Sequence, residues 1–299
     1  MFAVLPFTGC AFRTHPITTR TSTAVLKEAT LEQLVATVNT NAARLTSLKA
    51  TVDIDSSVLE QKKNLVKDNP EIRGYVLVRK PDMLRMIGLF SILHIQAFDM
   101  VSNGKTFALS IPKRSRFVVG SDRQPSQPSE QPLENIRPQH ILNALLLKRI
   151  DSAENEIAVL ENSTEIVKDP KSHKDVEQAD YIVLVVARDD AGSYLSRKIV
   201  FSRTDLLPNE QYIYNREGQL ATYAHYENFS DYNGTMFPGV VSIQRPTEGY
   251  GITLSIVKLD INWAFTDEDF VLPQPPGSQL INLDSKPSAA ALRNDTTKK

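Results

Sequence analysis

The sequence has little cysteine, little glycine and no excess of charge of either sign. Its 299 residues include one cysteine, so no disulfide within the chain stabilises the fold. With 12 glycines, the glycine-rich loops that bind phosphates are not expected. The formal net charge of −1, from 34 Lys and Arg against 35 Asp and Glu, excludes the basic footprint of a nucleic-acid-binding protein. No apolar run reaches about 18 residues, so no bilayer-crossing helix is predicted.

Motifs for chemistry are scarce as well. Asn103-Gly104-Lys105-Thr106 is like the end of a phosphate-binding loop, but Asp99 stands where that motif needs a glycine. No two of the five histidines lie at metal-ligand spacing, so we expect no metal and no cofactor. Adjacent carboxylates point apart, so Asp267-Glu268-Asp269 is expected to be a solvated turn. We expect no enzyme; a hydrolase would need His94 or His225 in a pocket beside a carboxylate and a hydroxyl.

The apolar content, in contrast, is that of a globular protein. The residues AVILMFWYC make up 41% of the chain, which is too much for a disordered one. The length allows one large domain or two small ones, with enough residues for a sizeable core.

The N-terminus carries the single cysteine directly after an apolar run. Phe7-Thr8-Gly9-Cys10 resembles a bacterial lipobox, in which the cysteine becomes the lipidated first residue of the mature protein. It departs from that pattern in having Phe7 where leucine is usual and in lacking a basic segment before the apolar run. We expect residues 1–10 to be the remnant of a signal peptide that begins upstream, Cys10 to be lipidated, and residues 11–29 to be a polar tether. The alternative is an incidental cysteine near a frayed terminus.

One long amphipathic helix is predicted over residues 30–48. Thr30 and Gln33 have the spacing of a capping box at its start. The apolar positions recur at helical period and form one stripe: Leu31, Leu34, Val35, Val38, Ala42, Leu45 and Leu48. Such a one-sided helix has to lie on another element.

Most of the remaining chain is predicted as strands. β-Branched and aromatic runs of strand length occupy residues 49–58, 73–80, 82–88, 94–101, 105–111, 156–160, 179–188, 194–203, 211–215, 220–227, 240–244 and 250–262. The short links between several of them favour antiparallel hairpins. Residues 121–135 read as a proline-rich loop, 138–148 as a short helix and 285–299 as a disordered tail, which leaves a single domain over 30–284.

Asn103-Gly104 predicts the register of one hairpin. A two-residue type I′ turn would pair Met100 with Phe107 and Phe98 with Leu109. These four large apolar side chains would then share one face, and the opposite face would be small or polar. We expect the apolar face to point inward, towards the helix predicted over 30–48.

The order of these elements resembles that of the LolA/LolB-like outer-membrane lipoprotein-sorting superfamily over about residues 31–283. The passages that carry the resemblance are Pro81-Asp82-Met83-Leu84-Arg85-Met86, the strand and turn of residues 98–105, and the closing segments 237–243, 252–262 and 270–273. The resemblance implies a mainly β (α+β) fold, an incomplete antiparallel β-barrel closed by two or three helices around an apolar cavity. LolA-like members carry lipoproteins and LolB-like members accept them at the outer membrane; Cys10 places this chain nearer the second kind. The chain departs from both in its greater length, with the 121–135 loop and extra strands.

This resemblance predicts a non-enzymatic, lipid-anchored protein of the bacterial envelope, monomeric and on the periplasmic side of the outer membrane. It would bind acyl chains of lipoproteins or lipid, and receive or sort lipoproteins. The residues expected to line its cavity are Leu34, Val38, Leu45, Leu84, Met86, Phe98, Met100, Phe107 and Leu109. The alternative is a structural or interaction lipoprotein whose core is filled by its own side chains, among them Tyr181 and Phe201.

The link over residues 88–93 is unusually apolar for a surface loop. Either the flanking strands continue through it, or Leu89 and Phe90 are exposed. LolB-like acceptors project an apolar residue in this part of the fold, which implies that Leu89 and Phe90 contact acyl chains or membrane, with Gly88 allowing the turn.

A basic cluster, Lys113-Arg114-Ser115-Arg116, follows Pro112. It is expected to be a solvated turn. The alternative is contact with anionic head groups, which is worth about 1 kcal/mol per charge near a membrane.

Overall fold

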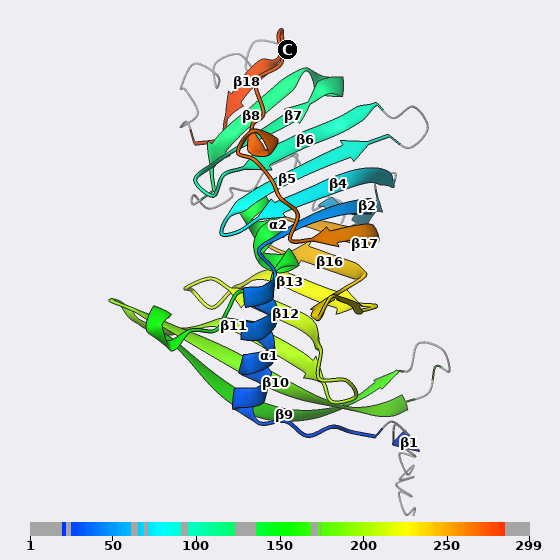
Figure 1. Ribbon diagram of the computed structural model, residues 1–299, viewed down its shortest axis with the longest axis vertical. Helices are drawn as coiled ribbons and strands as arrows, with labels where there is room; N and C mark the ends of the chain where they lie inside the picture. The colour runs from blue at the N-terminus through cyan, green and yellow to red at the C-terminus, as the bar shows by residue number, and fades with distance from the viewer. Residues whose placement is uncertain are drawn as a thin grey trace, which may run out of the picture.

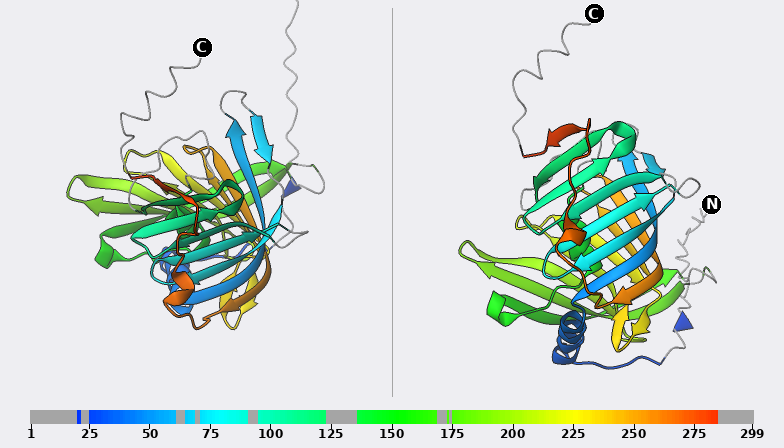
Figure 2. Two further views of the ribbon diagram at one scale, coloured as in Figure 1. Left: turned by 90° about the horizontal axis from the view of Figure 1, so that it is seen from above. Right: turned by 45° about the horizontal axis from the view of Figure 1, so that its top comes forward.

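The protein is built around one large, curved, open β-sheet. The computed structural model describes residues 20–21, 25–60, 65–68, 71–90, 95–122, 136–168, 173 and 175–284. Within these residues, 16 strands form one sheet and two more form a separate hairpin. Figure 1 shows the strands stacked along the long axis of the molecule, and Figure 2 shows how the sheet curls around its inner face. The predicted mainly antiparallel β architecture is confirmed, although the sheet stays open and does not close into a barrel.

The strand order pairs an early strand, β2, with a late one, β17, in the middle of the sheet, while the first and last described strands, β1 and β18, lie at its two edges. Along the sheet the order is β1 (Arg20–Thr21), β10 (Asp175–Asp189), β11 (Gly192–Ser202), β12 (Pro208–Tyr214), β13 (Leu220–Glu227), β16 (Val240–Arg245), β17 (Tyr250–Ile261), β2 (Ser47–Glu60), β4 (Ile72–Arg79), β5 (Met83–Leu89), β6 (Gln96–Ser102), β7 (Thr106–Ile111), β8 (Arg116–Ser121) and β18 (Gln279–Asn282). In addition, β9 (Glu156–Lys168) pairs with β10, β3 (Leu65–Asp68) with β2, and β14 (Ser230–Tyr232) with β15 (Thr235–Phe237). Two pairings, β1 with β10 and β18 with β8, are parallel.

The first helix, α1 (Leu31–Arg44), begins as predicted and ends earlier. The Gln33 amide donates to Thr30 Oγ1 (3.4 Å) and the Thr30 amide donates to Gln33 Oε1 (2.9 Å), so the capping box is confirmed. The predicted extension to residue 48 is wrong, because Leu48 belongs to β2. In β2, Leu48 is the first of four alternating buried side chains, followed by Ala50, Val52 and Ile54. Burial of every second residue is typical of a strand and not of a helix.

The second helix, α2 (Pro138–Leu145), covers the inner face near the middle of the sheet. It contacts β5, β6, β13 and β16, and in Figure 1 it lies between the two halves of the stack. Proline at its first turn fits the helix start, since that position needs no amide donor. Short 3₁₀ turns complete the described helical structure: η1 (Pro112–Arg114), η3 (Ser152–Glu154) and η4 (Glu268–Phe270).

Two separate clusters of buried side chains stabilise the fold. The main core joins α2 to β2, β4–β7, β13, β16 and β17, and contains Leu84, Met86, Met100, Phe107 and Leu109. The second cluster, here the α1 core, contains Leu34 and Val38 of α1 with Tyr181, Val183, Val185, Ile199 and Phe201 of β10 and β11. The helix α1 therefore covers a different part of the sheet from the one predicted, and α2 covers the face of β5 and β6 instead.

The β6–β7 hairpin has a different register from the predicted one. Its turn is longer, because Asn103 Oδ1 accepts hydrogen bonds from the amides of Lys105 (2.9 Å) and Thr106 (3.0 Å). As a result Met100 pairs with Leu109 and Ser102 with Phe107, a slip of two residues from the type I′ register. Because side chains alternate with period two, this slip leaves the same four residues on the inner face.

The strand β8 connects the predicted basic turn (113–116) to the predicted loop (121–135) and overlaps each of them by one residue; no strand is predicted there from the sequence. Phe117 and Val118 are buried, and Ser121 still pairs with Thr106, so the segment from 121 begins as strand. The rest of the predicted loop, residues 123–135, lies outside the described residues, as do Cys10, the predicted signal-peptide remnant and the tail over 285–299. Part of the predicted tether is structured: β1 pairs with β10, and the Lys27 amide donates to Arg203 O (2.7 Å).

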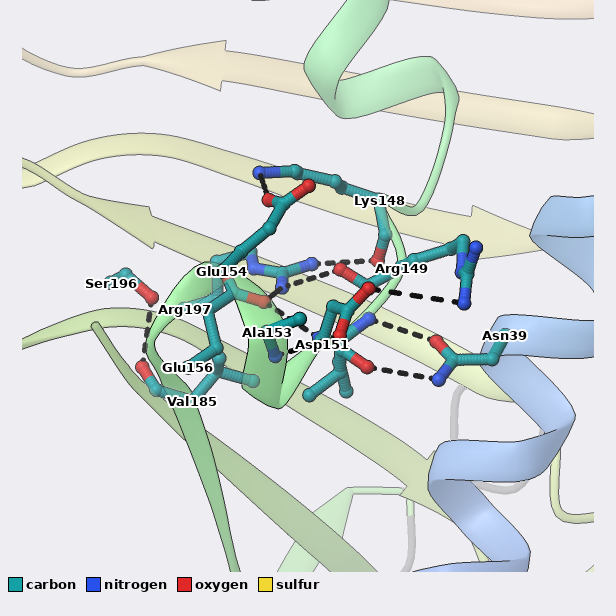
Figure 3. Close-up of polar contacts among 11 residues, drawn as sticks. Asn39, Lys148, Arg149, Asp151, Ala153, Glu154, Glu156, Val185, Ser196 and Arg197 are labelled. Atoms are coloured by element: carbon teal, nitrogen blue, oxygen red, sulfur yellow. Dashed lines mark hydrogen bonds and ion pairs between the residues drawn. The ribbon is translucent and has the colours of Figure 1, made fainter. Parts of the chain in front are cut away.

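A group of polar contacts ties α1, β9 and β11 to the connection between α2 and β9 (Figure 3). Asn39 of α1 donates to Ile150 O (2.9 Å) and accepts from the Ile150 amide (2.8 Å). Arg197 donates to Lys148 O (2.8 Å) and forms an ion pair with Glu156 (2.9 Å), and both side chains are buried.

Among the described residues, no helix combines the length and apolar character needed to cross a bilayer.

Candidate functional site

The candidate site is an apolar cavity between the inner face of the sheet and α2. Its volume is about 380 Å³, within the usual range of about 300–1,000 Å³ for small-molecule sites. The described residues that line it are Ile54, Ser56, Ile72, Met86, Phe90, Ala97, Phe98, Met100, Leu109, Ile111, Lys113, Arg114, Ile136, Ile141 and Ile252. With three exceptions, Ser56, Lys113 and Arg114, these side chains are apolar.

Strand alternation explains why this lining is apolar. On β5, Leu84 and Met86 are buried on the inner face, while Met83, Arg85 and Ile87 are only half-buried on the outer one. On β6 a bulge leaves one residue extra, because Gly88 pairs with Phe98 and Leu89 with Gln96. Ala97 is this extra residue, and it lines the cavity in addition to Phe98 and Met100. Above them, Ile141 of α2 is buried and covers the cavity.

The structure brings together four of the nine residues predicted to line one cavity. Met86, Phe98, Met100 and Leu109 line the apolar cavity. Leu84 and Phe107 are buried in the main core beside it.

The three predicted residues from the first helix lie elsewhere. Val38 and Leu45 line a second cavity of about 400 Å³, between α1, the end of α2 and the chain around Phe237. Leu34 is buried in the α1 core. The apolar side of α1 is buried as its periodicity predicts, but periodicity does not specify which part of the sheet that side packs against.

Leu89 and Phe90 do not form one projecting pair. Leu89 is the last residue of β5 and is half-buried, and the Phe90 amide donates to Ile95 O (2.9 Å), so hydrogen bonding between the two strands extends as far as Phe90 and Ile95. Phe90 has 38% of its surface exposed and also lines the cavity. Residues 91–94 lie outside the described part of the chain.

Several residues that line the cavity are not predicted from the sequence. Ile54 and Ile252 lie within predicted strands, and Ile72 begins β4 one residue before the strand predicted over 73–80. The alternation of apolar positions on β2 is a usable signal for Ile54. Ala97 faces the cavity because of the bulge, which nothing in the sequence indicates. Lys113 and Arg114 were singled out as a basic turn, yet their place beside the cavity follows from the curvature of the sheet.

Buried polar groups fix the start of α2 over the main core. Arg137, directly before the helix, donates to Ser121 O (3.2 Å) and stacks over the Phe107 ring at 5.0 Å. Nearby, Ser102 donates to Asp122 Oδ2 (2.7 Å). Burial lowers the pKa of Arg137 and raises the pKa of Asp122, because it disfavours the charged form of each.

His140 of α2 is held neutral. Burial, and then the positive charges of Arg245 and Arg137, lower its pKa from 6.5 to about 3. Its Nδ1 atom is buried and has no hydrogen-bond partner among the described residues.

We expect His140 to make the protein less stable in mild acid. Unfolding restores the ordinary pKa, so between pH 6.5 and about 3 the unfolded state binds the additional proton and stability falls as the pH falls. In His140→Gln, the loss of unfolding free energy between about pH 7.5 and about pH 5 should be smaller than in the wild type by up to about 2 kcal/mol. Urea unfolding at the two pH values measures this. Equal losses in the two proteins would contradict a depressed His140 pKa.

His225 lies in a cluster of polar side chains on β12 and β13. Its Nε2 atom is 3.5 Å from Glu227 and its Nδ1 atom 4.0 Å from Glu210, and the hydroxyls of Tyr212 and Tyr223 donate to Glu210 at 2.8 and 3.0 Å. Burial raises the pKa of both tyrosines, which disfavours their nucleophilic form. None of these residues lines the apolar cavity described above.

No metal site is seen in the part of the chain that the structure describes, because no three His, Cys, Asp or Glu side chains there are close enough to share an ion. Of the predicted solvated turn, Asp267 forms an ion pair with Arg79, and Asp269 O accepts from Arg85 (2.9 Å). This segment, at the start of η4, therefore anchors the C-terminal part of the chain to β4 and β5.

Comparisons with known proteins find likeness in structure only. The sequence matches no protein-family model, and no curated protein matches it. The structure is similar to that of a LolA superfamily protein from Nitrosomonas europaea, with a TM-score of 0.48 and 14% identity over 82% of this chain and 99% of the other. It is also similar to a domain assigned to outer-membrane lipoprotein sorting from Vibrio parahaemolyticus (TM-score 0.47, 13% identity, 79% and 95% covered). A DUF1329 family protein from Desulfovibrio piger gives a TM-score of 0.49 at 12% identity, with 80% and 94% covered. These are likenesses in structure at 12–14% sequence identity.

Proposed function

We propose that this chain is a non-enzymatic binding protein of the bacterial envelope that holds an acyl chain in its apolar cavity. The observation that carries the proposal is the cavity of about 380 Å³ between α2 and the inner face of the sheet. A core filled by its own side chains, as the alternative structural role requires, would leave no such space.

The lining is suited to a flexible hydrocarbon chain. Each methylene group moved from water into an apolar site gains about 0.8 kcal/mol. Met86 and Met100 lie on the cavity wall, and thioether side chains adapt to irregular apolar shapes. Phe90, partly exposed and on the same wall, is placed to contact a chain as it enters.

The setting of this activity is part of the proposal. We infer that Cys10 carries a lipid anchor, that the protein faces the periplasm at the outer membrane, and that its ligand is the acyl chain of a lipoprotein or lipid. The lipobox-like sequence Phe7-Thr8-Gly9-Cys10 and the superfamily resemblance support this setting.

A cavity-filling variant tests the binding role. Ala97→Trp should fill the cavity, so the affinity of the full chain for the neutral fluorescent probe 1-N-phenylnaphthylamine should fall about tenfold or more. Ala187→Trp is the matched control, because Ala187 lies on β10, away from the cavity. Native mass spectrometry of the wild type should in addition detect co-purified lipid. Absence of probe binding by the wild type, or equal binding by the two variants, would contradict the proposal.

A further inference from the structure

The cavity opens at one end of the sheet. Strand registers place the end of β5, the start of β6, the end of β7 and the start of β8 at this end, because Leu89 pairs with Gln96 and Ile111 with Arg116. Phe90, Lys113 and Arg114 are exposed here and line the cavity, so its mouth lies between them.

The mouth carries positive charge and no negative charge from the described lining. Lys113 and Arg114 belong to η1, and the described residues that line the cavity include no Asp or Glu. The sequence analysis left this basic cluster open between a solvated turn and contact with anionic groups. The position of Lys113 and Arg114 at the entrance of an apolar site favours contact with anionic groups.

The turn that presents these two cations is well fixed. Pro112 begins it, the Ser115 amide donates to Pro112 O (2.9 Å), and the Gln279 amide of β18 donates to Ser115 O (2.7 Å). Ser115 adopts the left-handed conformation (φ 49°), which ends η1 and leads into β8. The positions of residues 113 and 114 therefore follow from backbone contacts on both sides.

We propose that the ligand is an amphiphile with an anionic head group, a phosphate or carboxylate, which Lys113 and Arg114 hold at the mouth while its apolar chain fills the cavity. This inference rests on the proposed function. An acyl chain in the cavity leaves its head at the entrance, where Lys113 and Arg114 can donate charge-assisted hydrogen bonds to an anionic group. A cationic head is repelled by these two side chains, and a neutral head accepts weaker hydrogen bonds from them than an anion does.

A charge-neutralising pair of substitutions tests the inference. In Lys113→Gln/Arg114→Gln, the affinity for dodecyl phosphate should fall about tenfold, while the affinity for the neutral probe 1-N-phenylnaphthylamine stays unchanged. Arg114 also takes part in other contacts within the protein, so Lys113→Gln alone is included and should give part of the loss. The matched control is Lys105→Gln/Arg188→Gln, which removes the same charge at exposed positions that do not line the cavity.

Two further ligands test whether the anionic head group and the apolar chain are both recognised. Wild-type protein should bind dodecyl phosphate more tightly than dodecyltrimethylammonium, and inorganic phosphate should not compete. Equal binding of the two dodecyl ligands, or the same loss in the control pair, would overturn the inference. So would binding of inorganic phosphate as tight as that of dodecyl phosphate, which would indicate a site for a free anion.

A membrane-surface role has its own signature. If the Lys113→Gln/Arg114→Gln protein loses binding to phosphatidylglycerol vesicles but keeps its affinity for dodecyl phosphate, the cluster serves a bilayer and the inference fails. If the neutral probe binds and no head-group preference is found, only the inference fails. If the wild type does not bind the neutral probe, the proposed function fails with it.

Discussion

Replacing Arg197 by methionine should lower the free energy of unfolding by about 3–5 kcal/mol. Arg197 and Glu156 form an ion pair of 2.9 Å with 7% and 8% of their side-chain surface exposed. Arg197 also donates to Lys148 O (2.8 Å) and Arg149 O (3.1 Å), as Figure 3 shows. The methionine variant therefore leaves a carboxylate and two carbonyl oxygens without this donor. Urea unfolding followed by circular dichroism at neutral pH measures the loss.

Two further variants make this expectation specific. Lys148→Ala breaks the neighbouring pair with Glu154, whose side chains are 62% and 55% exposed. It should cost no more than about 1 kcal/mol, because exposed ion pairs contribute little. Adding Glu156→Leu to Arg197→Met should restore much of the lost stability, since the unpaired buried charge is then removed. Similar losses for Arg197→Met and Lys148→Ala would show that the buried pair does not hold β9 to β11.

Replacing Phe201 by alanine should lower the free energy of unfolding by about 3–5 kcal/mol and leave ligand binding intact. Phe201, on β11, is fully buried in the α1 core, in the same cluster as Leu34 and Val38 of α1. The apolar cavity lies against the main core, and Phe201 does not line it. The affinity for 1-N-phenylnaphthylamine, measured well below the unfolding midpoint, should therefore stay at the wild-type value.

Phe90→Ala is the matched variant at the cavity. Phe90 is 38% exposed and lines the cavity, so its removal should weaken probe binding and cost clearly less stability than Phe201→Ala. A reversed result, with binding lost in Phe201→Ala and stability lost in Phe90→Ala, would contradict the assignment of these two residues to separate clusters.

Local sequence signals determined most elements of this fold and the side of each that is buried. Thr30 and Gln33 specified where α1 begins, because a capping box involves only residues three apart. Alternation specified the inner faces of β5, β6 and β7, including Met86, Met100 and Leu109. These inner faces survived an incorrect hairpin register, because a slip of two residues keeps every side chain on its own side.

Tertiary structure decided which elements meet and where a cavity remains. Leu34 and Val38 pack against β10 and β11, far along the chain, while α2 covers β5 and β6. Periodicity reports that an element has an apolar side, but the partner for that side depends on the curvature of the sheet and on contacts between distant residues. The same holds for the mouth of the cavity. The sequence indicates only a basic turn at Lys113 and Arg114, and the paired ends of β5–β8 place these residues beside Phe90.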